Sequence, residues 1–431
     1  MKYQPYPAYK ESGVEWLGRV PNHWSIIPVY AVASLSNGFP FDSKRFSDTG
    51  VDSDRLIRIR DLLSDQQKTY TDEPCPEPAI ISNGDLLIGM DGDFNTHLWN
   101  RGPAKLNQRV CVLRSNSRAI TQYLQYSLAA PLQTINDLTY ATTVKHLSAQ
   151  QVLHTRIALP SLAELDYVVT HLNTETFRID TLIAKKTRFI ELLQEKRQAL
   201  ITRAVTRGLN PDAPMKDSGV EWIGEVPAHW SFVKIAHGFT QIGSGATPPS
   251  SEQSWYTDQG TPWVTTSELR ENVITETVKH VTDEALQQFS ALRIYPPGSL
   301  LIAMYGATIG RLAILGVNAS TNQACCVLSG PKKFNTKFIF YWLFAKKEAL
   351  VNFYAAGGGQ PNINKDVISS LRLPAPSVEE QAAIAKRLDE HTARIDTLIT
   401  KTQRSIELLQ ERRAALITAA VIGQIDLREA V

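Results

Sequence analysis

The chain has 431 residues, which is too long for one ordinary hydrophobic core and predicts two to four domains. Its 45 basic and 43 acidic side chains give a net charge of +2, so total charge gives no indication of nucleic-acid or membrane binding, although it is compatible with local patches. The cysteines form no metal-ligand or disulfide pattern, and neither a secretory signal nor a long apolar run occurs, so we expect a cytoplasmic protein without a membrane span.

The first element along the chain is a segment that occurs twice. KESGVEWLGRVPNHWS (residues 10–25) returns as KDSGVEWIGEVPAHWS (residues 216–231), and 12 of the 16 aligned positions are identical. Its tryptophans supply apolar area while its glycines and prolines fix the bends, so we expect each copy to brace a helix end. Contact with a partner subunit is the alternative. If the segment is a brace, replacing Trp16 and Trp222 by Ala lowers thermal stability.

Each copy is followed by a long region that differs between the two halves. Short apolar runs bounded by Gly, Pro and Asn predict strands in these regions: DLLIGM (85–90), RVCVLR (109–114), SLLIAMYG (299–306) and ACCVLSG (324–330). A weak similarity aligns NGDLLIGMDG with PGSLLIAMYG, and Asn107-Gln108 with Asn322-Gln323. We therefore expect two mixed α/β domains of one type, with more strand than helix.

A second repeated element follows each of these regions and predicts a long helix. RIDTLIAKKTRFIELLQEKRQALITRAV (178–205) and RIDTLITKTQRSIELLQERRAALITAAV (394–421) space their apolar residues mainly three, four and seven apart. Ser161 and Ser377 are predicted N-caps, each with a glutamate three residues later, Glu164 or Glu380, in a capping box. A helix over 161–208 is roughly 70 Å long. We expect the two helices to pair as an antiparallel coiled coil; the alternative is that each covers only its own domain.

The chain lacks the motifs of the common catalytic sites. It has no G-x-x-x-x-G-K-[ST] phosphate loop, no H-E-x-x-H or Cys-x-x-Cys metal motif, and no Asn/Asp-Pro-Pro-Tyr/Phe motif of amino-methyltransferases. His23 and His229 lie in the repeated segment, where we expect a packing or capping role. We therefore predict no catalytic residues and no metal site. Two constant frames around two different domains favour double-stranded DNA as the ligand, because its half-sites repeat along a rigid duplex.

Taken together, these motifs resemble a known family. SGVEWLGRVPNHW and its second copy, GGGQPNINKDVISSLRLPAPSVEEQAAIAKRLDEHTARIDTLI (357–399) and IELLQERRAALITAAVIGQID (406–426) resemble the specificity subunit of Type I restriction-modification enzymes. The resemblance covers nearly the whole chain and departs from the family in YATTVKHLSAQ (140–150), where the second half has the glycine-rich segment.

This resemblance implies a non-catalytic subunit whose two variable domains are target recognition domains. Each would read one half of an interrupted DNA target, while the paired helices set the spacing and dock the methyltransferase subunits. The implied partners are double-stranded DNA, two methyltransferase (modification) subunits and restriction (translocase and nuclease) subunits. No cofactor is implied for this chain; S-adenosylmethionine, ATP and Mg²⁺ would be used by the partner subunits. The assembled complex would be a Type I site-specific deoxyribonuclease and an adenine-specific DNA methyltransferase.

The predicted fold class is α/β (α+β), with two similar mixed α/β target recognition domains in a pseudo-twofold arrangement, separated by two long antiparallel coiled-coil helices. The predicted segments, in chain order, are the N-terminal repeated segment 1–25, the first recognition domain 26–160, the central long helix 161–210, the second repeated segment with its linker 211–231, the second recognition domain 232–376 and the C-terminal long helix 377–431.

The candidate DNA-binding residues are basic, amide, hydroxyl and aromatic side chains near predicted turns, because such groups contact phosphates and base edges. In the first domain they are Arg101, Lys105, Asn107, Gln108, Arg109, Thr143, Lys145 and His146. In the second domain they are Tyr305, Thr308, Arg311, Asn322, Gln323, Gln360, Asn362 and Lys365. The Asn-Gln pair recurs in both halves and cannot encode different targets, so we expect a structural turn or a shared backbone contact there.

Other functions remain open at this point. A two-domain coiled-coil scaffold would bind proteins rather than DNA, and its binding would not weaken steeply with salt as DNA binding does. A stand-alone DNA-binding regulator would bind tightly without a methyltransferase. A nuclease with a dispersed site would cleave DNA by itself with Mg²⁺, which we predict does not occur.

Overall fold

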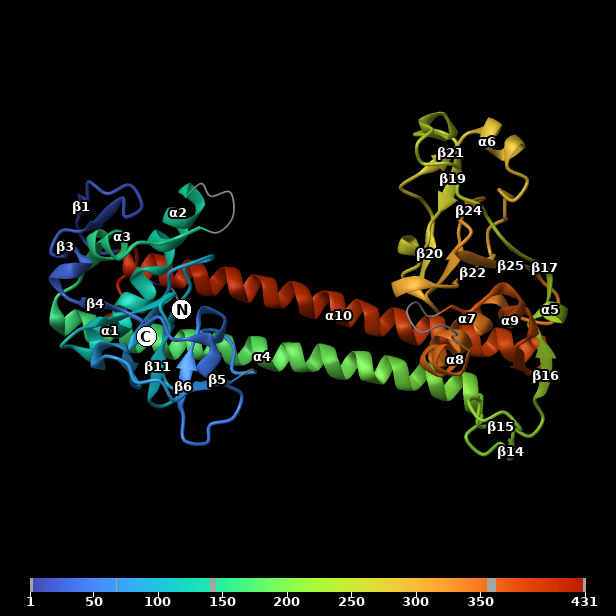
Figure 1. Cartoon of the computed structure of the whole chain (residues 1–431), viewed down its shortest axis with the longest axis horizontal. Helices are drawn as coiled ribbons and strands as arrows, with labels where there is room; N and C mark the ends of the chain where they lie inside the picture. The colour runs from blue at the N-terminus through green and yellow to red at the C-terminus, as the bar shows by residue number, and fades with distance from the viewer. Residues whose placement is uncertain (1–2, 67, 140–144, 355–361, 429–431) are drawn as a thin grey trace. The chain divides into compact units, whose positions relative to one another are not determined.

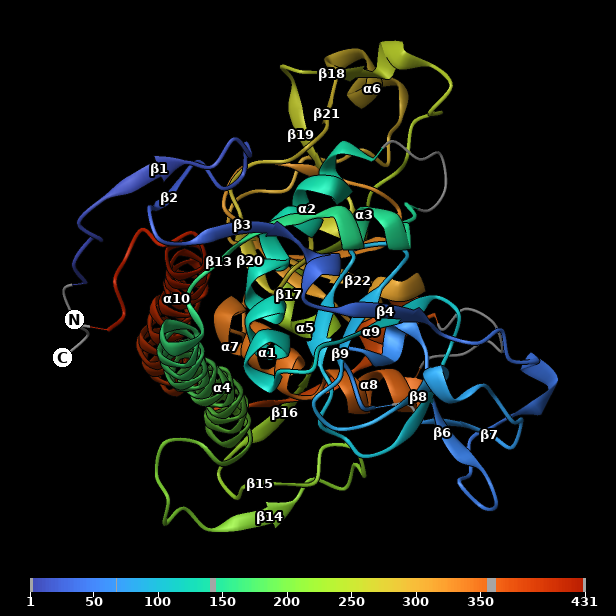
Figure 2. The ribbon, with the colours of Figure 1, turned by 90° about the vertical axis from the view of Figure 1, so that its left-hand side faces the viewer.

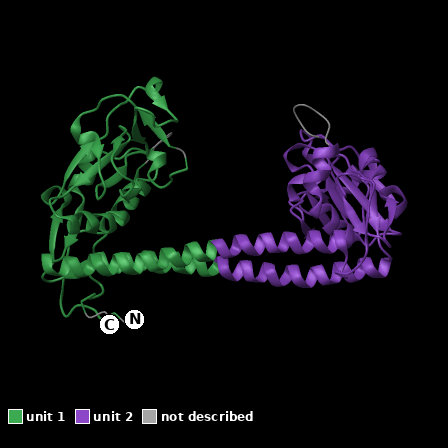
Figure 3. Ribbon diagram, turned by 90° about the horizontal axis from the view of Figure 1, so that it is seen from below, with its two compact units in different colours: residues 1–187, 404–431 green, residues 188–403 purple. Residues whose placement is uncertain are grey.

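The computed structural model describes residues 3–66, 68–139, 145–354 and 362–428 (Figure 1). They form two compact units, unit 1 with residues 1–187 and 404–431 and unit 2 with residues 188–403 (Figure 3). Each unit therefore contains about half of each long helix, whereas the predicted segments kept each helix whole. The predicted segments follow the order of the chain, whereas the two units are defined by their internal contacts. The predicted segment boundaries therefore stay a prediction.

Unit 1 contains two main sheets. One has the strand order β10-β9-β12-β4 and the other β5-β7-β6-β11-β8. The strands of the first sheet are β4 (Ser34–Asn37), β9 (Leu86–Gly89), β10 (Thr96–Leu98) and β12 (Val110–Arg114). Those of the second sheet are β5 (Phe46–Ser47), β6 (Asp54–Ile57), β7 (Thr69–Thr71), β8 (Ile80–Ile81) and β11 (Ala104–Leu106). Two further strand pairs are β1 (Tyr9–Glu11) with β2 (Arg19–Pro21) and β3 (Ser25–Pro28) with β13 (Arg156–Leu159).

The β9–β12 sheet of unit 1 lies between helices and the second sheet. Side chains alternate between the two faces of a strand, and here both faces are buried. Leu86 and Ile88 pack in the cluster that contains α1 (Arg118–Ser127), α3 (Ala149–His154) and the long helices, while Leu87 packs with the second sheet. A remaining helix of this unit is α2 (Ala129–Leu138).

Unit 2 repeats this arrangement with other side chains. Its main sheets have the orders β17-β25-β22-β23-β20 and β18-β21-β19-β24. The first comprises β17 (Phe239–Ser244), β20 (Asn272–Ile274), β22 (Leu300–Ala303), β23 (Leu312–Leu315) and β25 (Cys325–Pro331), and the second β18 (Tyr256–Thr257), β19 (Thr261–Val264), β21 (His280–Val281) and β24 (Ser320–Thr321). Leu300 and Ile302 face the helix-containing cluster and Leu301 faces the second sheet, as in unit 1.

The remaining elements of unit 2 complete the correspondence. They are the strand pairs β14 (Met215–Asp217) with β15 (Glu225–Pro227) and β16 (Ser231–Lys234) with β26 (Arg372–Ala375), and the helices α5 (Ile235–Gly238), α6 (Asp283–Gln288), α7 (Thr336–Ala345), α8 (Lys347–Tyr354) and α9 (Lys365–Ser370). The four predicted strands are confirmed as β9, β12, β22 and β25. The prediction of two mixed α/β domains of one type is confirmed as well.

The two predicted long helices are α4 (Leu162–Arg207) and α10 (Val378–Val421). In unit 1 the start of α4 shares a hydrophobic cluster with the end of α10, and Arg413 pairs with Asp180 at 2.8 Å. In unit 2 the equivalent pair has exchanged helices, with Arg197 bound to Asp396 at 3.0 Å. Both units therefore pair the helices in antiparallel orientation, which the sequence predicted but could not prove.

The repeated segment fastens its His-Trp pair to a glutamate at the start of a long helix. In unit 1 the buried Trp24 donates its indole N–H to Glu164 Oε2 at 3.1 Å, and His23 Nε2 lies 2.9 Å from the same oxygen. In unit 2, Trp230 donates to Glu380 at 3.1 Å, and His229 lies 3.0 Å from that carboxylate. A buried indole N–H needs an acceptor, and a carboxylate is a strong one.

The capping-box prediction is therefore correct in only one of its two hydrogen bonds. The Ser161 and Ser377 hydroxyls accept from the backbone N–H three residues later, at 3.4 and 3.2 Å. The carboxylates of Glu164 and Glu380, however, are turned toward the repeated segment rather than back to the cap. The indole and imidazole donors outcompete the exposed cap N–H because they offer the carboxylate hydrogen bonds in a drier environment.

The same segment also holds the end of the other long helix in each unit. Gly423 ends α10 and Gly208 ends α4, with φ of 70° and 72° that favour glycine. A Cβ at Gly423 would lie 2.3 Å from Pro21 Cδ, and one at Gly208 would lie 3.5 Å from the indole of Trp230. Each repeated segment thus fastens the start of one long helix and the end of the other, which we call the helix latch.

In unit 1 the helix latch also includes both described ends of the chain. Asp426 donates its backbone N–H to Gln4 at 2.7 Å, in a β-bridge near the chain ends (Figure 2). Tyr6 donates its hydroxyl to Glu164, and burial together with this carboxylate raises the pKa of Tyr6. Arg428 lies over the Tyr6 ring and 3.9 Å from Glu164. The carboxylate in unit 1 is consequently more enclosed than that of Glu380.

The two tryptophans chosen from the sequence are not equivalent in the structure. Trp222 is 6% exposed and packs against Trp342 and Tyr354, whereas Trp16 is 40% exposed and donates to the Arg156 carbonyl at 3.2 Å. The predicted bracing role therefore rests on Trp24 and Trp230, which are almost completely buried in both copies.

Replacing Glu164 by Ala should lower the free energy of unfolding by about 3 kcal/mol, because the buried Trp24 and Tyr6 and the more exposed His23 lose their partner. Glu380→Ala should cost about half as much, because Glu380 is more exposed and receives two donors. Urea unfolding measures both, with the exposed Asp166→Ala on the same helix turn as control. Unchanged unfolding together with lost partner binding would assign the segment to partner contact instead.

Candidate nucleic-acid interface

Three chain segments meet at one edge of the main sheet in unit 1. They are the turn after β9 (90–92), the turn before β12 (107–109) and the residues before α3 (145–147). Met90 donates its N–H to the Arg109 carbonyl at 2.9 Å and accepts from Leu147 at 2.7 Å, and Gly92 donates to the Lys145 carbonyl at 3.0 Å. These backbone hydrogen bonds hold the three segments together independently of the side chains that point outward. We call this arrangement the three-segment junction.

Asp91 organises the outward side chains of this junction. Its carboxylate is hydrogen-bonded to His146 Nδ1 at 2.7 Å and forms an ion pair with Arg109 Nη1 at 3.0 Å. The Asp91 side chain is 17% exposed, whereas those of Arg109 and His146 are 56% and 61% exposed. The pair therefore presents a guanidinium and an imidazole to solvent in fixed orientations, which suits a phosphate or the edge of a guanine.

Unit 2 builds the same junction with different chemistry. Met304 donates to the Ala324 carbonyl at 2.9 Å and accepts from Ile363 at 2.8 Å. Tyr305 forms a β-bridge with Asn362, as Asp91 does with His146 in unit 1. Burial raises the pKa of Tyr305, so its phenol stays protonated and can both donate and accept a hydrogen bond.

The Asn-Gln pairs lie in turns whose backbone is hydrogen-bonded within each unit, and their contact with DNA stays a prediction. Asn107 donates its backbone N–H to Ile57 at 2.9 Å, and Asn322 donates to Val264 at the same distance. The Asn322 side chain also accepts from the Ala324 N–H at 3.2 Å. Gln108 and Gln323 are exposed, and Gln323 accepts a hydrogen bond from the Thr247 hydroxyl. The asparagines thus connect the two sheets of each unit.

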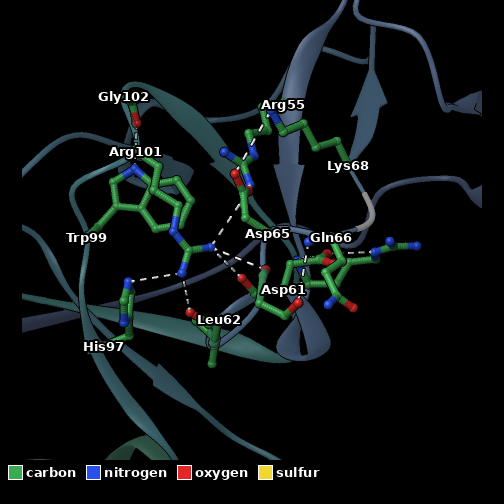
Figure 4. A network of polar contacts seen from close by, with 12 residues as sticks. Arg55, Asp61, Leu62, Asp65, Gln66, Lys68, His97, Trp99, Arg101 and Gly102 are labelled. Carbon is green, nitrogen blue, oxygen red and sulfur yellow. Dashed lines mark hydrogen bonds and ion pairs between the residues drawn. The ribbon is translucent and has the colours of Figure 1, made fainter. Parts of the chain in front are cut away.

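Three predicted DNA-binding cations of unit 1 are engaged inside the domain. Arg101 donates to backbone carbonyls of the loop after β6 (Figure 4). Lys105 is 8% exposed and donates to the Glu73 carbonyl at 2.6 Å, and Lys145 donates to the Asn136 carbonyl at 2.6 Å. These hydrogen bonds favour a structural role for the three cations, and Lys105 also pairs with Asp54 at 3.0 Å. DNA contact by them stays a prediction.

The other candidates of unit 2 surround its junction. Thr308 and Arg311 are half-buried in the turn that follows Tyr305, and Lys365 is exposed at the start of α9. Arg311 makes no ion pair with a described residue, so its charge is available to a ligand. Thr143 and Gln360 lie outside the described residues. DNA contact by any of these side chains stays a prediction.

Sequence analysis did not select Asp91, although a signal for it was present. The weak similarity of GMDG to AMYG aligns Asp91 with Tyr305, at a position where the two halves differ between constant neighbours. Such a position within a repeated frame is a candidate for specificity. Sequence analysis also did not select the loop of residues 58–66. The side chains that this loop exposes depend on its contacts with residues distant in sequence, such as Arg101.

The described residues contain no group of three or more His, Cys, Asp or Glu that could hold a metal ion. Burial raises the pKa of the Cys111 and Cys326 thiols to about 12, which makes them poor nucleophiles at neutral pH. None of the described helices is both long and apolar enough to cross a membrane.

Residues 26–194 and 227–408 each match the model of the type I restriction modification DNA specificity domain. The chain belongs to this family. Each matched range covers one variable domain and most of the long helix that follows it. As a member of the family, the chain is a specificity subunit with two target recognition domains, which we call the first and second recognition domains.

Curated relatives match this chain over most of their own length. The chain is 26% identical to the Type I restriction enzyme EcoBI specificity subunit of Escherichia coli, over 96% of this chain and 89% of the relative. It is 23% identical to the MjaVIII specificity subunit of Methanocaldococcus jannaschii, over 97% of both chains.

Solved structures share the fold of the specificity subunit. A chain from a study of complex assembly and conformational transition in the type I R-M system has a TM-score of 0.71 at 17% identity, over 94% of this chain and 99% of that one. The HsdS subunit from Thermoanaerobacter tengcongensis has a TM-score of 0.51 at 17% identity, over 94% of this chain and 98% of that one.

Asp91→Asn should destabilise the first recognition domain by about 1–3 kcal/mol, because the Arg109 guanidinium and the His146 imidazole lose a carboxylate partner. Asp93→Asn is the matched control, since Asp93 is exposed two residues away and makes no hydrogen bond or ion pair with the described side chains of the junction. Urea unfolding of the two variants measures the difference. Equal unfolding curves would mean that Asp91 does not hold Arg109 and His146 in solution.

Proposed function

We propose that this specificity subunit directs methylation and cleavage to one interrupted DNA sequence, each recognition domain reading one half. The observation that carries the proposal is the three-segment junction, which has the same backbone contacts in both domains and different side chains at equivalent places. Asp91 and His146 stand where the second domain has Tyr305 and Asn362. A constant scaffold with different outward groups suits the reading of two different half-sites.

In this function the chain contributes binding and position, and its partners contribute the reactions. The paired helices set the spacing of the half-sites and dock two methyltransferase subunits, and restriction subunits join the complex. S-adenosylmethionine, ATP and Mg²⁺ act in those partners, within the cytoplasm. The antiparallel helix contacts support the spacer role, because two ion-paired helices bend less than a single one.

The test is a methylome in a host that lacks adenine methylation, expressing the methyltransferase subunit with and without this chain. We expect methylation of one interrupted motif, on both strands, only when the chain is present. Methylation in the absence of this chain would contradict the proposal. So would a lack of methylation when this chain and the methyltransferase subunit are soluble and co-purify.

DNA binding by the complex should also weaken steeply between about 50 and 200 mM salt, because phosphate contacts release counterions.

A further inference from the structure

Arg101 binds three backbone carbonyls of one loop in the first recognition domain. Arg101 Nη1 donates to the Asp61 carbonyl at 3.0 Å and to the Ser64 carbonyl at 3.3 Å, and its Nη2 donates to the Leu62 carbonyl at 2.9 Å (Figure 4). The planar guanidinium presents its donors in a fixed fork, so three carbonyls bound to it fix the backbone path of the loop.

A second arginine and an aromatic ring complete this support. Arg55 pairs with Asp65, and the guanidinium groups of Arg55 and Arg101 lie 5.4 and 5.2 Å from the centre of the Trp99 ring. Trp99 is fully buried and supplies a rigid surface for both cations. Burial lowers the pKa of His97, and the charge of Arg101 lowers it further, so the imidazole beside Arg101 is neutral at pH 7.

The supported loop carries exposed side chains that match the chemistry of DNA. Because its carbonyls are bound to Arg101, Leu63 is turned outward and is 63% exposed. Gln66 and Arg60 are exposed as well, and Arg60 makes no ion pair with a described residue. A pocket of about 590 Å³ beside the loop is lined by Phe46, Asp48, Arg58, Arg60, Gln66, Lys68 and Thr69, in which cations outnumber carboxylates.

This loop lies next to the three-segment junction. Strands β6 and β11 are parallel, so the residues that follow Ile57 and Leu106 lie at the same sheet edge. Asn107 confirms the proximity by donating to the Ile57 carbonyl at 2.9 Å. A Cβ at Gly89 would lie 3.1 Å from Ile59, which places the base of the loop against the strand end that leads to Asp91.

We propose that the loop of residues 60–66 reads bases in the half-site of the first recognition domain, and that Arg101 is its positioning residue. The inference rests on the proposed function and names the reading surface within it. The Gln66 amide can bind an adenine edge, Leu63 can contact a thymine methyl group, and Arg60 can bind a phosphate. A loop with a fixed backbone loses less entropy on binding than a mobile one.

The second recognition domain supports its equivalent loop in another way. After Val264, the Glu268 carboxylate accepts from the Thr265 N–H at 2.7 Å and from the Val278 N–H at 3.0 Å. The first loop has a comparable carboxylate, since Asp61 accepts from the Arg58 N–H at 3.0 Å, and it adds the Arg101 guanidinium bound to three carbonyls. In the second loop Arg270 donates to the Ser267 carbonyl at 3.1 Å. The Arg101-supported loop is thus particular to the first domain and should affect one half of the target only.

The experiment compares methylomes of the methyltransferase complex that carries wild-type chain, Leu63→Ala/Gln66→Ala or Val51→Ala. Val51 is 76% exposed at the opposite end of β6 and controls for the loss of an exposed apolar side chain. We expect the double variant to lose roughly tenfold in discrimination at positions of one half-site, with the other half and the Val51→Ala motif unchanged. An unchanged motif in the double variant would overturn the proposal.

The Arg101→Lys variant tests the positioning role separately, because lysine keeps the charge but lacks the fork. We expect it to relax the same half-site as the double variant while the melting temperature of the complex changes little. Equal loss at both half-sites, in parallel with a lower melting temperature, would assign Arg101 a general folding role and overturn its positioning role. If the complex with the wild-type chain methylates no interrupted motif, the proposed function itself is wrong. That result differs from the one that overturns only the loop proposal, in which the double variant methylates the same motif as wild type.

Discussion

The structure depends on one repeated interaction, a glutamate carboxylate that binds the indole and imidazole N–H groups of a His-Trp pair. In each unit this bond joins the repeated segment to the start of one long helix, while a glycine at the end of the other helix packs on the same segment. A buried indole N–H without an acceptor is costly, and so is a buried carboxylate without donors, so each half of the interaction requires the other. This mutual requirement explains why two nearly identical segments and two nearly identical helices occur in one chain.

The helix latch separates the constant part of the molecule from the variable part. Each recognition domain keeps its backbone junction through main-chain hydrogen bonds, which do not depend on the identity of the outward side chains. Asp91 in one domain and Tyr305 in the other therefore occupy the same place without a change in the scaffold. A specificity subunit needs this property, because a new target must be reached by side-chain substitution with the fold and the partner surfaces retained.

The elements with strong local patterns could be predicted from the sequence. The long helices, the four apolar strands and the duplication followed from periodicity and repetition. The fate of individual charges could not be predicted. Arg101, Lys105 and Lys145 were candidates for DNA contact because they are cations near turns, yet each donates to a backbone carbonyl of another segment.

The helix starts illustrate the same limit. Ser161 and Ser377 were identified as caps from local sequence, but the carboxylates of Glu164 and Glu380 bind donors more than a hundred residues away. A local motif therefore predicts the element boundary well and the side-chain partners poorly, since those partners are decided by tertiary packing. Asp91 was missed for a related reason. Its role is to bind Arg109 and His146, and only the folded chain brings these residues next to it.

The central claim is that a constant helix latch supports two different DNA-reading junctions. Hydrogen–deuterium exchange of the methyltransferase complex, with and without a duplex that carries its methylation motif, tests this claim most directly. The account predicts added protection at residues 89–92, 107–109 and 145–148 and at 303–311, 322–324 and 362–365, with none at residues 20–24 and 226–230 of the latch. Protection confined to one recognition domain, or centred on the latch, would contradict it.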